Sequence, residues 1–359
     1  MPRSQPDLDV CILGHAALGE IGGVTRWAER LGRALPGLRV AATPVRDRAH
    51  DLPSARLYHA LTPDVAAAVA PAARAAGRPL VLTCHAVNAA WRPEGWRGPL
   101  APDASNPHGT PPGHGGTPPG QGGDPPGRPP RKGLAGYAAP EVIVAVGEAV
   151  ARSHVAAGAP ADRMLVIPNG APAPAAVPSR ATEPVVGFVG RLAPVKGIER
   201  LLEAVRMVRA ELPARLVLVG PDDGPAGYGG RLRRLAEAPG LRGAVTFAGA
   251  DRPERWYPRM ACMALASESE GMPLALLEAM SHGVPCVAPD VGGCAEALGE
   301  AGVIVPPRDA DALAGAILRL LEDRAEAGRL ARLGRERAGR WTEADCAAAY
   351  AEVYRRLLV

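Results

Sequence analysis

The fold is decided by residues 185–220, VVGFVGRLAPVKGIERLLEAVRMVRAELPARLVLVG. Two short apolar runs, 185–190 and 215–220, flank a stretch over 197–211 in which apolar residues recur at helical spacing. A strand, a helix and a second strand in this order are typical of a parallel sheet with a crossover helix. We therefore predict an α/β protein.

The same alternation of apolar runs and helical periodicity extends over both halves of the chain. Strands are predicted in the first half at 9–14, 38–45, 55–61, 79–87, 141–147 and 164–170, and in the second half also at 244–249, 262–267, 285–290 and 302–307. Amphipathic helices are predicted near 24–35, 230–238 and 274–282, and the tail from residue 310 reads as helical. Two successive α/β repeats predict two Rossmann-like domains that face each other across a cleft.

The domain boundaries follow from a change in composition. Residues 171–184, APAPAAVPSRATEP, are rich in Pro and Ala and lack periodicity, as an interdomain linker does. We place an N-terminal domain at 1–178 and a C-terminal domain at 179–340, with a last helix at 341–359 that packs back towards the N-terminal domain.

Residues 99–131 break the pattern. They are low-complexity Pro/Gly sequence with almost no apolar side chains, so burial cannot offset the entropy lost on ordering them. We expect a mobile loop here, and a polyproline segment that binds a partner is the alternative.

Length and composition limit the class of protein. Of 359 residues, 47% are hydrophobic and 22% charged, so the chain can bury a sizeable core. With 41 basic and 37 acidic side chains, the net charge of +4 is too balanced to indicate a nucleic-acid-binding protein. No signal-peptide pattern and no run of about 18 apolar residues occur, so we expect a soluble cytoplasmic protein.

The six cysteines are scattered and form no C-x-x-C pair, which predicts reduced, mostly buried thiols. They are Cys11, Cys84, Cys262, Cys286, Cys294 and Cys346. No H-E-x-x-H, G-x-S-x-G, P-loop or metal-spaced Cys/His pattern is found, and no dinucleotide fingerprint follows the first strand. Metal sites, acyl-enzyme chemistry and a Rossmann oxidoreductase are therefore unsupported.

Ligands of open α/β sheets bind outside the carboxyl ends of the strands. Three groups of residues are predicted to lie there. In the first, Gly22 and Gly23 would let backbone amides approach an anion at the start of the 24–35 helix. A plain loop that needs positive φ explains the same glycines equally well.

The second group is Arg191 and Lys196, which stand five residues apart between a strand end and a helix start. Two cations beside the positive end of the helix dipole would neutralise a diphosphate. A pair of solvated loop cations is the alternative.

The third group is Glu270 and Glu278, and their spacing of eight residues proves nothing by itself. Glu278 falls among apolar neighbours, where an unpaired carboxylate is costly to bury, so it is expected to bind something specific such as sugar hydroxyls. Glu270 precedes a helix start, where a carboxylate and free amides could hold a polyol; a simple helix N-terminal carboxylate is the alternative.

His85 ends the apolar strand PLVLTCHAV. A histidine at a strand end that faces an interdomain cleft can donate a hydrogen bond to a substrate oxygen. A core or surface histidine without such a role fits the sequence as well.

Taken in order, these motifs resemble a known family. GFVGRLAPVKGIERLLEAV, LVLVGPDDGPAGY, VTFAGA and SESEGMPLALLEAMSHGVPCVAPDVGG are similar to retaining glycosyltransferases of family four (glycosyltransferase group 1 type), which have the GT-B fold. The resemblance covers 140–359 well, and VLTCHAV, VAVGEAV and VIPNGA fit it in the first half. Within the family, IGGVTRWAERL, VLTCHAVNAAWRPEG and DVGGCAEAL resemble the PelF-like branch of exopolysaccharide assembly.

The resemblance implies a role for each matched residue. Arg191 and Lys196 would bind the donor diphosphate, stabilise the leaving nucleotide and replace a divalent metal, so neither a metal nor a cofactor is expected. Glu278 would hold the ribose hydroxyls, and Glu270 would hold the donor sugar. Together with Glu270, the amides of the segment Gly271, Met272, Pro273 and Leu274 would hold the donor sugar.

For the N-terminal domain, the resemblance places Gly22 and Gly23 near the phosphates and His85 near the transferred sugar. It makes the N-terminal domain the acceptor side and the C-terminal domain the nucleotide-sugar donor side. One departure matters: in relatives the segment after the His85 strand builds helices around the acceptor, whereas this chain has the Pro/Gly stretch. Acceptor recognition is therefore the least secured part of the prediction.

The expected function is retaining transfer of a hexose from a nucleotide diphosphate sugar, UDP-linked such as UDP-glucose, to a hydroxyl of a carbohydrate or other small-molecule acceptor. The protein would be cytoplasmic, with peripheral association at the inner face of the membrane, in a biosynthetic complex, as a further option. Two alternatives stay open. One is a GT-B nucleotide-sugar epimerase, and the other is a non-catalytic nucleotide-sugar-binding subunit of a polysaccharide assembly complex.

Overall fold

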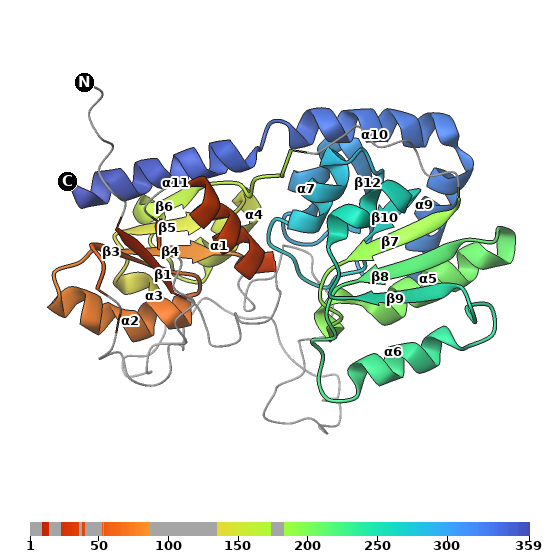
Figure 1. The fold of residues 1–359 in the computed structure, drawn as a ribbon, viewed down its shortest axis with the longest axis horizontal. Coiled ribbons are helices and arrows are strands. Elements are labelled where there is room, and N and C mark those ends of the chain that lie inside the picture. Colours follow the sequence, from red (N-terminus) through yellow and green to blue (C-terminus); the bar gives the residue numbers. More distant parts are fainter. Residues whose placement is uncertain are drawn as a thin grey trace, which may run out of the picture.

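The computed structural model describes residues 9–13, 23–35, 38–39, 52, 54–86, 135–173 and 183–359. The predicted loop at 99–131 and the position of Gly22 lie outside these residues. Within them, the chain forms two six-stranded sheets, one after the other along the sequence (Figure 1).

The first sheet has the strand order β2-β1-β3-β4-β5-β6, and all of its described pairings are parallel. Its strands are β1 (Val10–Leu13), β2 (Leu38–Arg39), β3 (Leu57–Ala60), β4 (Leu80–Cys84), β5 (Val142–Ala145) and β6 (Met164–Val166). The helices of this half are α1 (Gly23–Ala34), α2 (Pro63–Ala75), α3 (Ala135–Ala138) and α4 (Glu148–Ala156). Strands β1, β3 and β4 are apolar apart from His59 and Thr83 and buried along their whole length, as strands covered on both faces are.

The second sheet has the order β12-β11-β10-β7-β8-β9 and is also parallel. Its strands are β7 (Val185–Val189), β8 (Arg215–Val219), β9 (Val245–Gly249), β10 (Cys262–Ala264), β11 (Cys286–Pro289) and β12 (Gly302–Val305). The helices are α5 (Ile198–Glu211), α6 (Tyr228–Ala236), α7 (Leu274–Ser281), α8 (Cys294–Leu298), α9 (Ala310–Glu322), α10 (Arg324–Ala338) and α11 (Glu343–Leu358).

Each predicted strand contains an observed one, and the predicted α/β fold with two Rossmann-like domains is confirmed. The observed strands are shorter than the apolar runs, and the predicted strand at 38–45 is described only at Leu38–Arg39. The domain boundary at 178 falls within 174–182, which the structure does not describe, so that boundary stays a prediction.

The chain crosses between the two domains twice, at neighbouring places. Ala171 N donates to Trp341 O over 2.7 Å, and Glu343 N donates to Ala171 O over 3.1 Å. After this return crossing, α11 runs along the first domain, whereas α10 lies over the second (Figure 1). The last helix therefore belongs spatially to the first domain, next to α1.

Helix α11 completes a core on one face of the first sheet. Tyr350 and Tyr354 are fully buried there with Trp27 of α1. His59 of β3 lies among them, and its Nδ1 is 2.7 Å from the Tyr354 hydroxyl while its Nε2 is 2.7 Å from Thr83 Oγ1. Both ring nitrogens of a fully buried histidine are thereby hydrogen-bonded, as burial requires.

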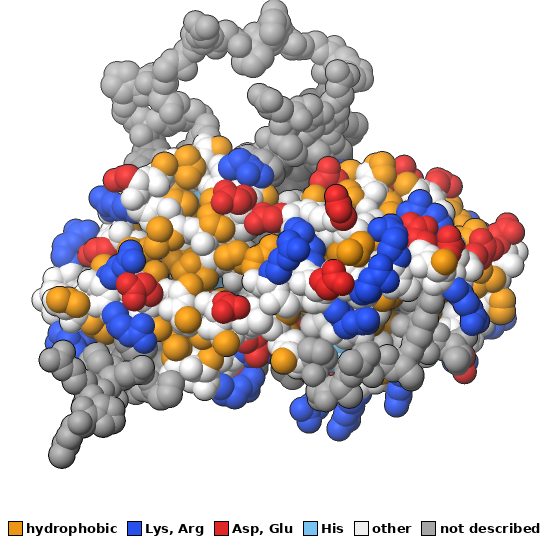
Figure 2. Space-filling view, turned by 90° about the horizontal axis from the view of Figure 1, so that it is seen from above, with side chains coloured by type: hydrophobic (Ala, Val, Ile, Leu, Met, Phe, Trp, Pro, Cys, Tyr) orange, Lys and Arg blue, Asp and Glu red, His pale blue; other side chains and the backbone are white. Residues whose placement is uncertain are grey.

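All six cysteines are buried and none forms a disulfide, which confirms the prediction of scattered, buried free thiols. On the face that carries the C-terminal helices, acidic and basic side chains are interspersed rather than separated by sign (Figure 2). Arg332–Glu336 on α10 and Arg356–Glu352 on α11 are examples of such pairs. No helix in the described part of the chain is long and apolar enough to cross a membrane.

Candidate functional site

The direction of strand succession in the second sheet reverses between β7 and β10. Strands β8 and β9 follow on one side of β7, and β10, β11 and β12 follow on the other. Loops that leave the carboxyl ends of the strands at such a switch point diverge, and ligands of open α/β sheets bind between them. Arg191 and Lys196 follow β7, and Glu270 follows β10, so all three belong to these two loops.

Lys196 and Glu270 form an ion pair between the two loops. Lys196 Nζ lies 2.7 Å from Glu270 Oε1, and Ser267 Oγ donates to the same oxygen over 2.6 Å. Glu270 is only 8% exposed, so its charge is buried with one cation and one hydroxyl as partners. The loops are joined further because Glu268 N donates to Val195 O over 2.8 Å.

Arg191 has a different partner. Its guanidinium pairs with Asp223, from the loop after β8, and its side chain is half-exposed. A parallel bridge between Leu192 and Asp222 holds these two loops together. The two predicted cations are therefore both at the strand ends, but each is ion-paired to a separate carboxylate rather than standing free in solvent.

Residues 270–274 lie against the first domain. A Cβ on Gly271 would meet His85 O at 2.0 Å, so only glycine lets the backbone come this close. Asn169, just after β6, donates from Nδ2 to Met272 O over 2.8 Å. Leu274 packs against the core formed by α1 and α11. The segment is thus held between the carboxyl ends of both sheets.

Two glycines support the same segment from the other side. A Cβ on Gly292 would lie 1.8 Å from Glu270 O, and one on Gly293 would lie 2.4 Å from Gly271 O. Gly293 N also donates to Gly271 O over 2.7 Å. Helix α7 then begins at Leu274 after Pro273, and no described side chain caps its N-terminus. The first amides of α7 can therefore contribute to binding an anion or a polyol.

His85 follows β4 and stacks edge-on against Trp27, with ring centroids 4.6 Å apart. Burial lowers the pKa of His85 to about 3, so the imidazole is neutral at physiological pH. Its Nε2 is buried and has no hydrogen-bond partner among the described residues. In the neutral imidazole this nitrogen could donate or accept a hydrogen bond, depending on its tautomer.

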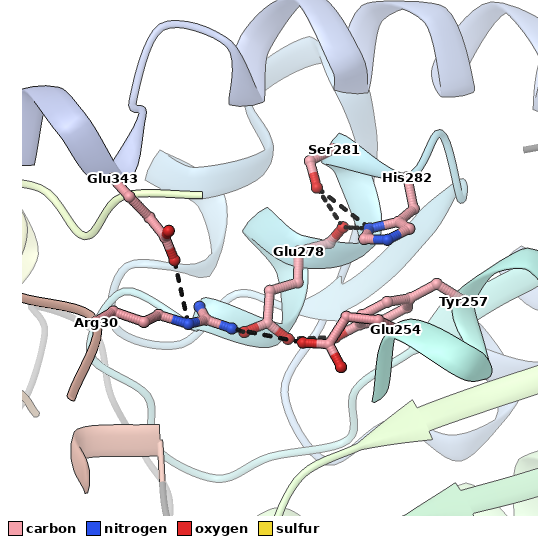
Figure 3. A network of polar contacts seen from close by, with 7 residues as sticks. All are labelled: Arg30, Glu254, Tyr257, Glu278, Ser281, His282 and Glu343. Carbon is pink, nitrogen blue, oxygen red and sulfur yellow. Dashed lines mark hydrogen bonds and ion pairs between the residues drawn. The ribbon is translucent and has the colours of Figure 1, made fainter. Parts of the chain in front are cut away.

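Glu278 has well-defined protein partners. It is 1% exposed, its Oε1 lies 2.8 Å from an Nη of Arg30, and Tyr257 donates to Oε2 over 2.6 Å (Figure 3). Arg30 belongs to α1 of the first domain, whereas Glu278 belongs to α7 of the second. The charge of Glu278 thus has protein partners, and both its expected binding of sugar hydroxyls and its ribose role stay predictions.

The structure thus brings together some of the predicted residues and not others. Lys196 contacts Glu270, and His85 contacts Gly271, while Arg191 and Glu278 are each engaged by a residue that the sequence did not single out. Gly23 is the first residue of α1, as expected for a helix N-terminus, and Gly22 lies outside the described residues.

Several residues at the site escaped the sequence analysis. They are Arg30, Asn169, Asp223, Tyr257 and Ser267, and each takes its position from contacts between distant segments. No local sequence signal marks these five residues, whereas composition adds one for Lys196, which the sequence had already indicated: of the 41 basic residues, only Lys132 and Lys196 are lysines. A lysine in a chain that otherwise uses arginine indicates that position 196 needs a compact ammonium.

A metal site is not evident in the described part of the chain. No three side chains of His, Cys, Asp or Glu there are grouped so that they could hold a metal ion.

The second domain matches a known family model. Residues 183–323 match the family described as glycosyl transferases group 1. This range contains both loops of the switch point and α7, so the residues described above lie inside the matched domain, apart from those contributed by the first domain.

Curated relatives match part of the chain. An exopolysaccharide phosphotransferase of Streptomyces coelicolor is 36% identical over 174 residues, which is 47% of this chain and 18% of the relative. A D-inositol 3-phosphate glycosyltransferase of Corynebacterium urealyticum is 34% identical over 185 residues, 48% of this chain and 43% of the relative. An alpha-D-kanosaminyltransferase of Streptomyces kanamyceticus is 36% identical over 147 residues, 39% of this chain and 37% of the relative. The chain thus covers less than half the length of each of these relatives.

Solved structures match nearly the whole chain. HepE of Anabaena, in complex with UDP-glucose, superposes with a TM-score of 0.76 at 20% identity, covering 96% of this chain and 98% of HepE. Sucrose-phosphate synthase of Thermosynechococcus elongatus superposes with a TM-score of 0.73 at 21% identity, covering 97% and 99%. At this identity the likeness establishes the fold. The chain therefore carries a glycosyl transferases group 1 domain at residues 183–323, and its two α/β domains have the architecture of the GT-B glycosyltransferases.

Proposed function

We propose that the protein is a retaining glycosyltransferase that moves a hexose from a UDP-linked sugar to a hydroxyl group of a carbohydrate or other small acceptor. The observation that carries the proposal is the partly buried Lys196–Glu270 pair at the switch point of the second sheet, between the loops where a ligand of this fold binds. The family match of residues 183–323 and the UDP-glucose bound by HepE support a nucleotide sugar as donor.

Lys196 is the residue proposed to bind the donor diphosphate. Its side chain is 19% exposed and its ammonium is held in place by Glu270, so we expect a diphosphate to reach it without reordering of the loop. Arg191 would add a second cation by exchanging Asp223 for a phosphate oxygen. Two fixed cations stabilise the negative charge that develops on the leaving nucleotide.

The donor sugar would lie between the 270–274 segment and His85. Glu270 would accept hydrogen bonds from sugar hydroxyls while it remains paired with Lys196, because a carboxylate offers about four lone-pair sites. The first amides of α7 and the Nε2 of neutral His85, for which the described residues supply no side-chain cap and no hydrogen-bond partner, would contribute from opposite domains. Glu278 is the residue proposed to hold the ribose hydroxyls.

In the transfer step, the bond between sugar C1 and the diphosphate oxygen breaks, and the acceptor oxygen bonds to C1 on the same face. The acceptor proton leaves with the diphosphate, so atoms and charge balance without a protein nucleophile. The same cations would make a divalent metal unnecessary. We place the reaction in the cytoplasm, on a carbohydrate acceptor, with peripheral association with an exopolysaccharide assembly complex as an extension of the proposal.

The experiment is a transfer assay with purified protein, UDP-glucose labelled in the glucose, and a panel of sugar acceptors, with and without EDTA. Release of UDP with formation of an α-linked product, unaffected by EDTA, is the expected result. Lys196→Met keeps the aliphatic stem but loses the charge, and it should lower turnover about a hundredfold. Arg206→Met, which removes an exposed cation of α5, is the matched control and should leave turnover unchanged.

Three other outcomes would contradict the proposal. Inversion at C2 of the donor sugar without an acceptor would identify an epimerase. Donor binding without UDP release by any acceptor or by water would identify a non-catalytic binding subunit. A β-linked product would exclude a retaining reaction.

A further inference from the structure

Arg30 is placed where both domains and the returning chain meet. It stands on the third turn of α1, with only 11% of its side chain exposed, and it reaches acidic residues of three separate elements. Its Nε lies 3.1 Å from Glu343 Oε1 at the start of α11, and one Nη lies 2.8 Å from Glu278 Oε1 of α7 (Figure 3). The same Nη is 3.9 Å from the partly exposed Glu254, which belongs to the turn Pro253–Arg255.

The Glu278 carboxylate is fixed by this arrangement on both of its oxygens. Arg30 holds Oε1, and Tyr257 holds Oε2. Tyr257 is itself fully buried, with its ring 4.9 Å from that of His282. Its pKa is raised well above the ordinary value by burial and by Glu278, so it stays a neutral donor. A carboxylate with two such partners keeps one orientation, and these two contacts use only part of its roughly four lone-pair sites.

Removing the cation would leave Glu278 almost without compensation for its charge. A buried carboxylate that loses its cation either reorients towards water or draws water in, and in both cases its geometry changes. In the intact protein the Arg30 side chain has little room to adopt another position, because the cavity beside it, lined by Leu274 and Glu343 among others, measures only about 20 Å³. Arg30 is therefore held in one place by the packing of three elements.

We propose that Arg30 is a positioning residue for the donor site, which acts from the first domain by holding the Glu278 carboxylate in its ligand-binding orientation. This inference rests on the proposed function, in which Glu278 accepts the ribose hydroxyls. Nucleotide affinity then depends on the position of α1 relative to α7, since the guanidinium bridges the two helices. A side chain of the N-terminal domain thus affects how tightly the C-terminal domain binds the nucleotide.

The test is a double-mutant cycle on UDP affinity, measured by calorimetry for wild type, Arg30→Met, Glu278→Gln and the double variant. Arg30→Met should raise the Kd for UDP about tenfold or more, the loss expected for a charge-assisted contact. If Arg30 acts through Glu278, the double variant binds no more weakly than Glu278→Gln alone. Arg30→Lys should recover part of the affinity. In Arg30→Met, KM for the donor should rise while kcat changes little.

Two controls separate this role from a merely structural one. Glu343→Gln removes the other close partner of Arg30 and should change the Kd for UDP less than threefold; an effect as large as that of Arg30→Met would place the role at the α11 crossing instead. Arg206→Met should leave the Kd unchanged. All Kd values are taken at a temperature where melting curves show every variant folded, and Arg30→Lys serves if Arg30→Met does not fold.

The outcomes distinguish the two proposals. If wild type does not bind UDP or UDP-glucose at all, the proposed function fails. If wild type binds UDP and Arg30→Met binds it equally well, the positioning role is overturned while the proposed function stands. Additive losses in the double variant would also overturn it, because Arg30 would then act independently of Glu278.

Discussion

At the scale of single residues, position 196 is notable because it is a lysine in a chain that uses arginine almost everywhere else. Its ammonium pairs with Glu270, with Nζ 2.7 Å from the carboxylate. A guanidinium is larger, planar and points several donors in fixed directions, so it cannot occupy the same space in the same way. Because the chain otherwise favours arginine, the lysine at position 196 is informative, and its pairing with Glu270 offers a reason for it.

Gly271 offers a residue-scale test of the contact between domains. Gly271→Ala places a Cβ 2.0 Å from His85 O, so the loop or the strand end must shift. Urea unfolding should show a destabilisation of about 1–3 kcal/mol, the usual cost of overpacking. Gly315→Ala in α9, where a Cβ meets no atom within 4 Å, should instead stabilise by about 0.5–1 kcal/mol. Equal effects of the two substitutions would refute the close approach of Gly271 to His85.

At the scale of elements, helix α4 shows how one domain completes the other. Its N-cap is Gly147, which has no side chain, and the Glu296 carboxylate of α8 accepts from Glu148 N over 3.1 Å and from Ala149 N over 3.3 Å. A negative charge at the positive end of a helix is favourable, and it satisfies two otherwise free amides. This cap comes from the opposite domain, so it strengthens the same interface that holds residues 270–274.

Replacing this cap should weaken the structure measurably. Glu296→Ala should lower the free energy of unfolding by about 1–2 kcal/mol, as loss of an N-cap does. Glu237→Ala removes an exposed glutamate whose partner Arg242 lies 3.6 Å away, and its effect should stay within about 0.5 kcal/mol. Chemical denaturation of the two variants measures the difference. A cost for Glu296→Ala no larger than that for Glu237→Ala would show that the cap contributes nothing.

Helix α11 gives the protein a pH-dependent anchor. Burial, with a smaller contribution from His85, lowers the pKa of His59 to about 3, compared with about 6.5 in an unfolded chain. As the pH falls, His59 therefore takes up a proton in the unfolded chain at a higher pH than in the folded protein. The stability that His59 contributes is complete above pH 6.5 and is lost as the pH falls towards 3. At pH 5 the free energy of unfolding is lower by about 2 kcal/mol than at high pH for this reason.

Denaturant titrations at pH 7 and pH 5 check this expectation. Wild type should lose about 2 kcal/mol more between these values than His59→Gln, which does not titrate in this range. The variant is expected to be less stable than wild type at pH 7, because glutamine cannot reproduce both hydrogen bonds to Tyr354 and Thr83. Equal pH dependence of the two proteins would mean that His59 takes up a proton as readily in the fold as in the unfolded chain.

At the scale of the whole molecule, the division into two parallel sheets was predictable because parallel strands buried on both faces are nearly continuous apolar runs. Helix α2 was not predicted: it is largely alanine, which gives little hydrophobic contrast, and it contains Pro71. Thr62 and Pro63 do mark its start, since Thr62 Oγ1 accepts from Val65 N and proline suits the first turn.

The site could be predicted only as far as local sequence determines it. Lys196, Glu270 and His85 were found because each stands at the end of a predicted strand, where ligands of this fold bind. The partners of Glu278 could not be found in this way. Arg30 lies 248 positions away in the other domain, and only the folded arrangement of the two domains brings the two charges together. One basic residue on an amphipathic helix carries no sign of such a contact.

The reactivity of the buried thiols measures how well the hydrophobic cores of both domains exclude solvent. Burial raises the pKa of Cys84 and Cys262 to about 12 and that of Cys346 to about 11, which suppresses the reactive thiolate. In the native protein at pH 8, a thiol reagent such as Ellman's reagent should therefore label fewer than one cysteine per chain within minutes. All six should react in denaturant. Rapid labelling of the native protein would show that the cores are more open than the structure indicates.

In the proposed function, the loops after β7 and β10 bind a nucleotide sugar through Lys196. Calorimetric titration with UDP and UDP-glucose, in the presence of EDTA, tests it most directly, with GDP-mannose and NAD as comparison ligands. We expect UDP and UDP-glucose to bind equally well with and without EDTA, and Lys196→Met to bind them about tenfold or more weakly. Absence of binding by wild type, or equal binding by Lys196→Met, would contradict it.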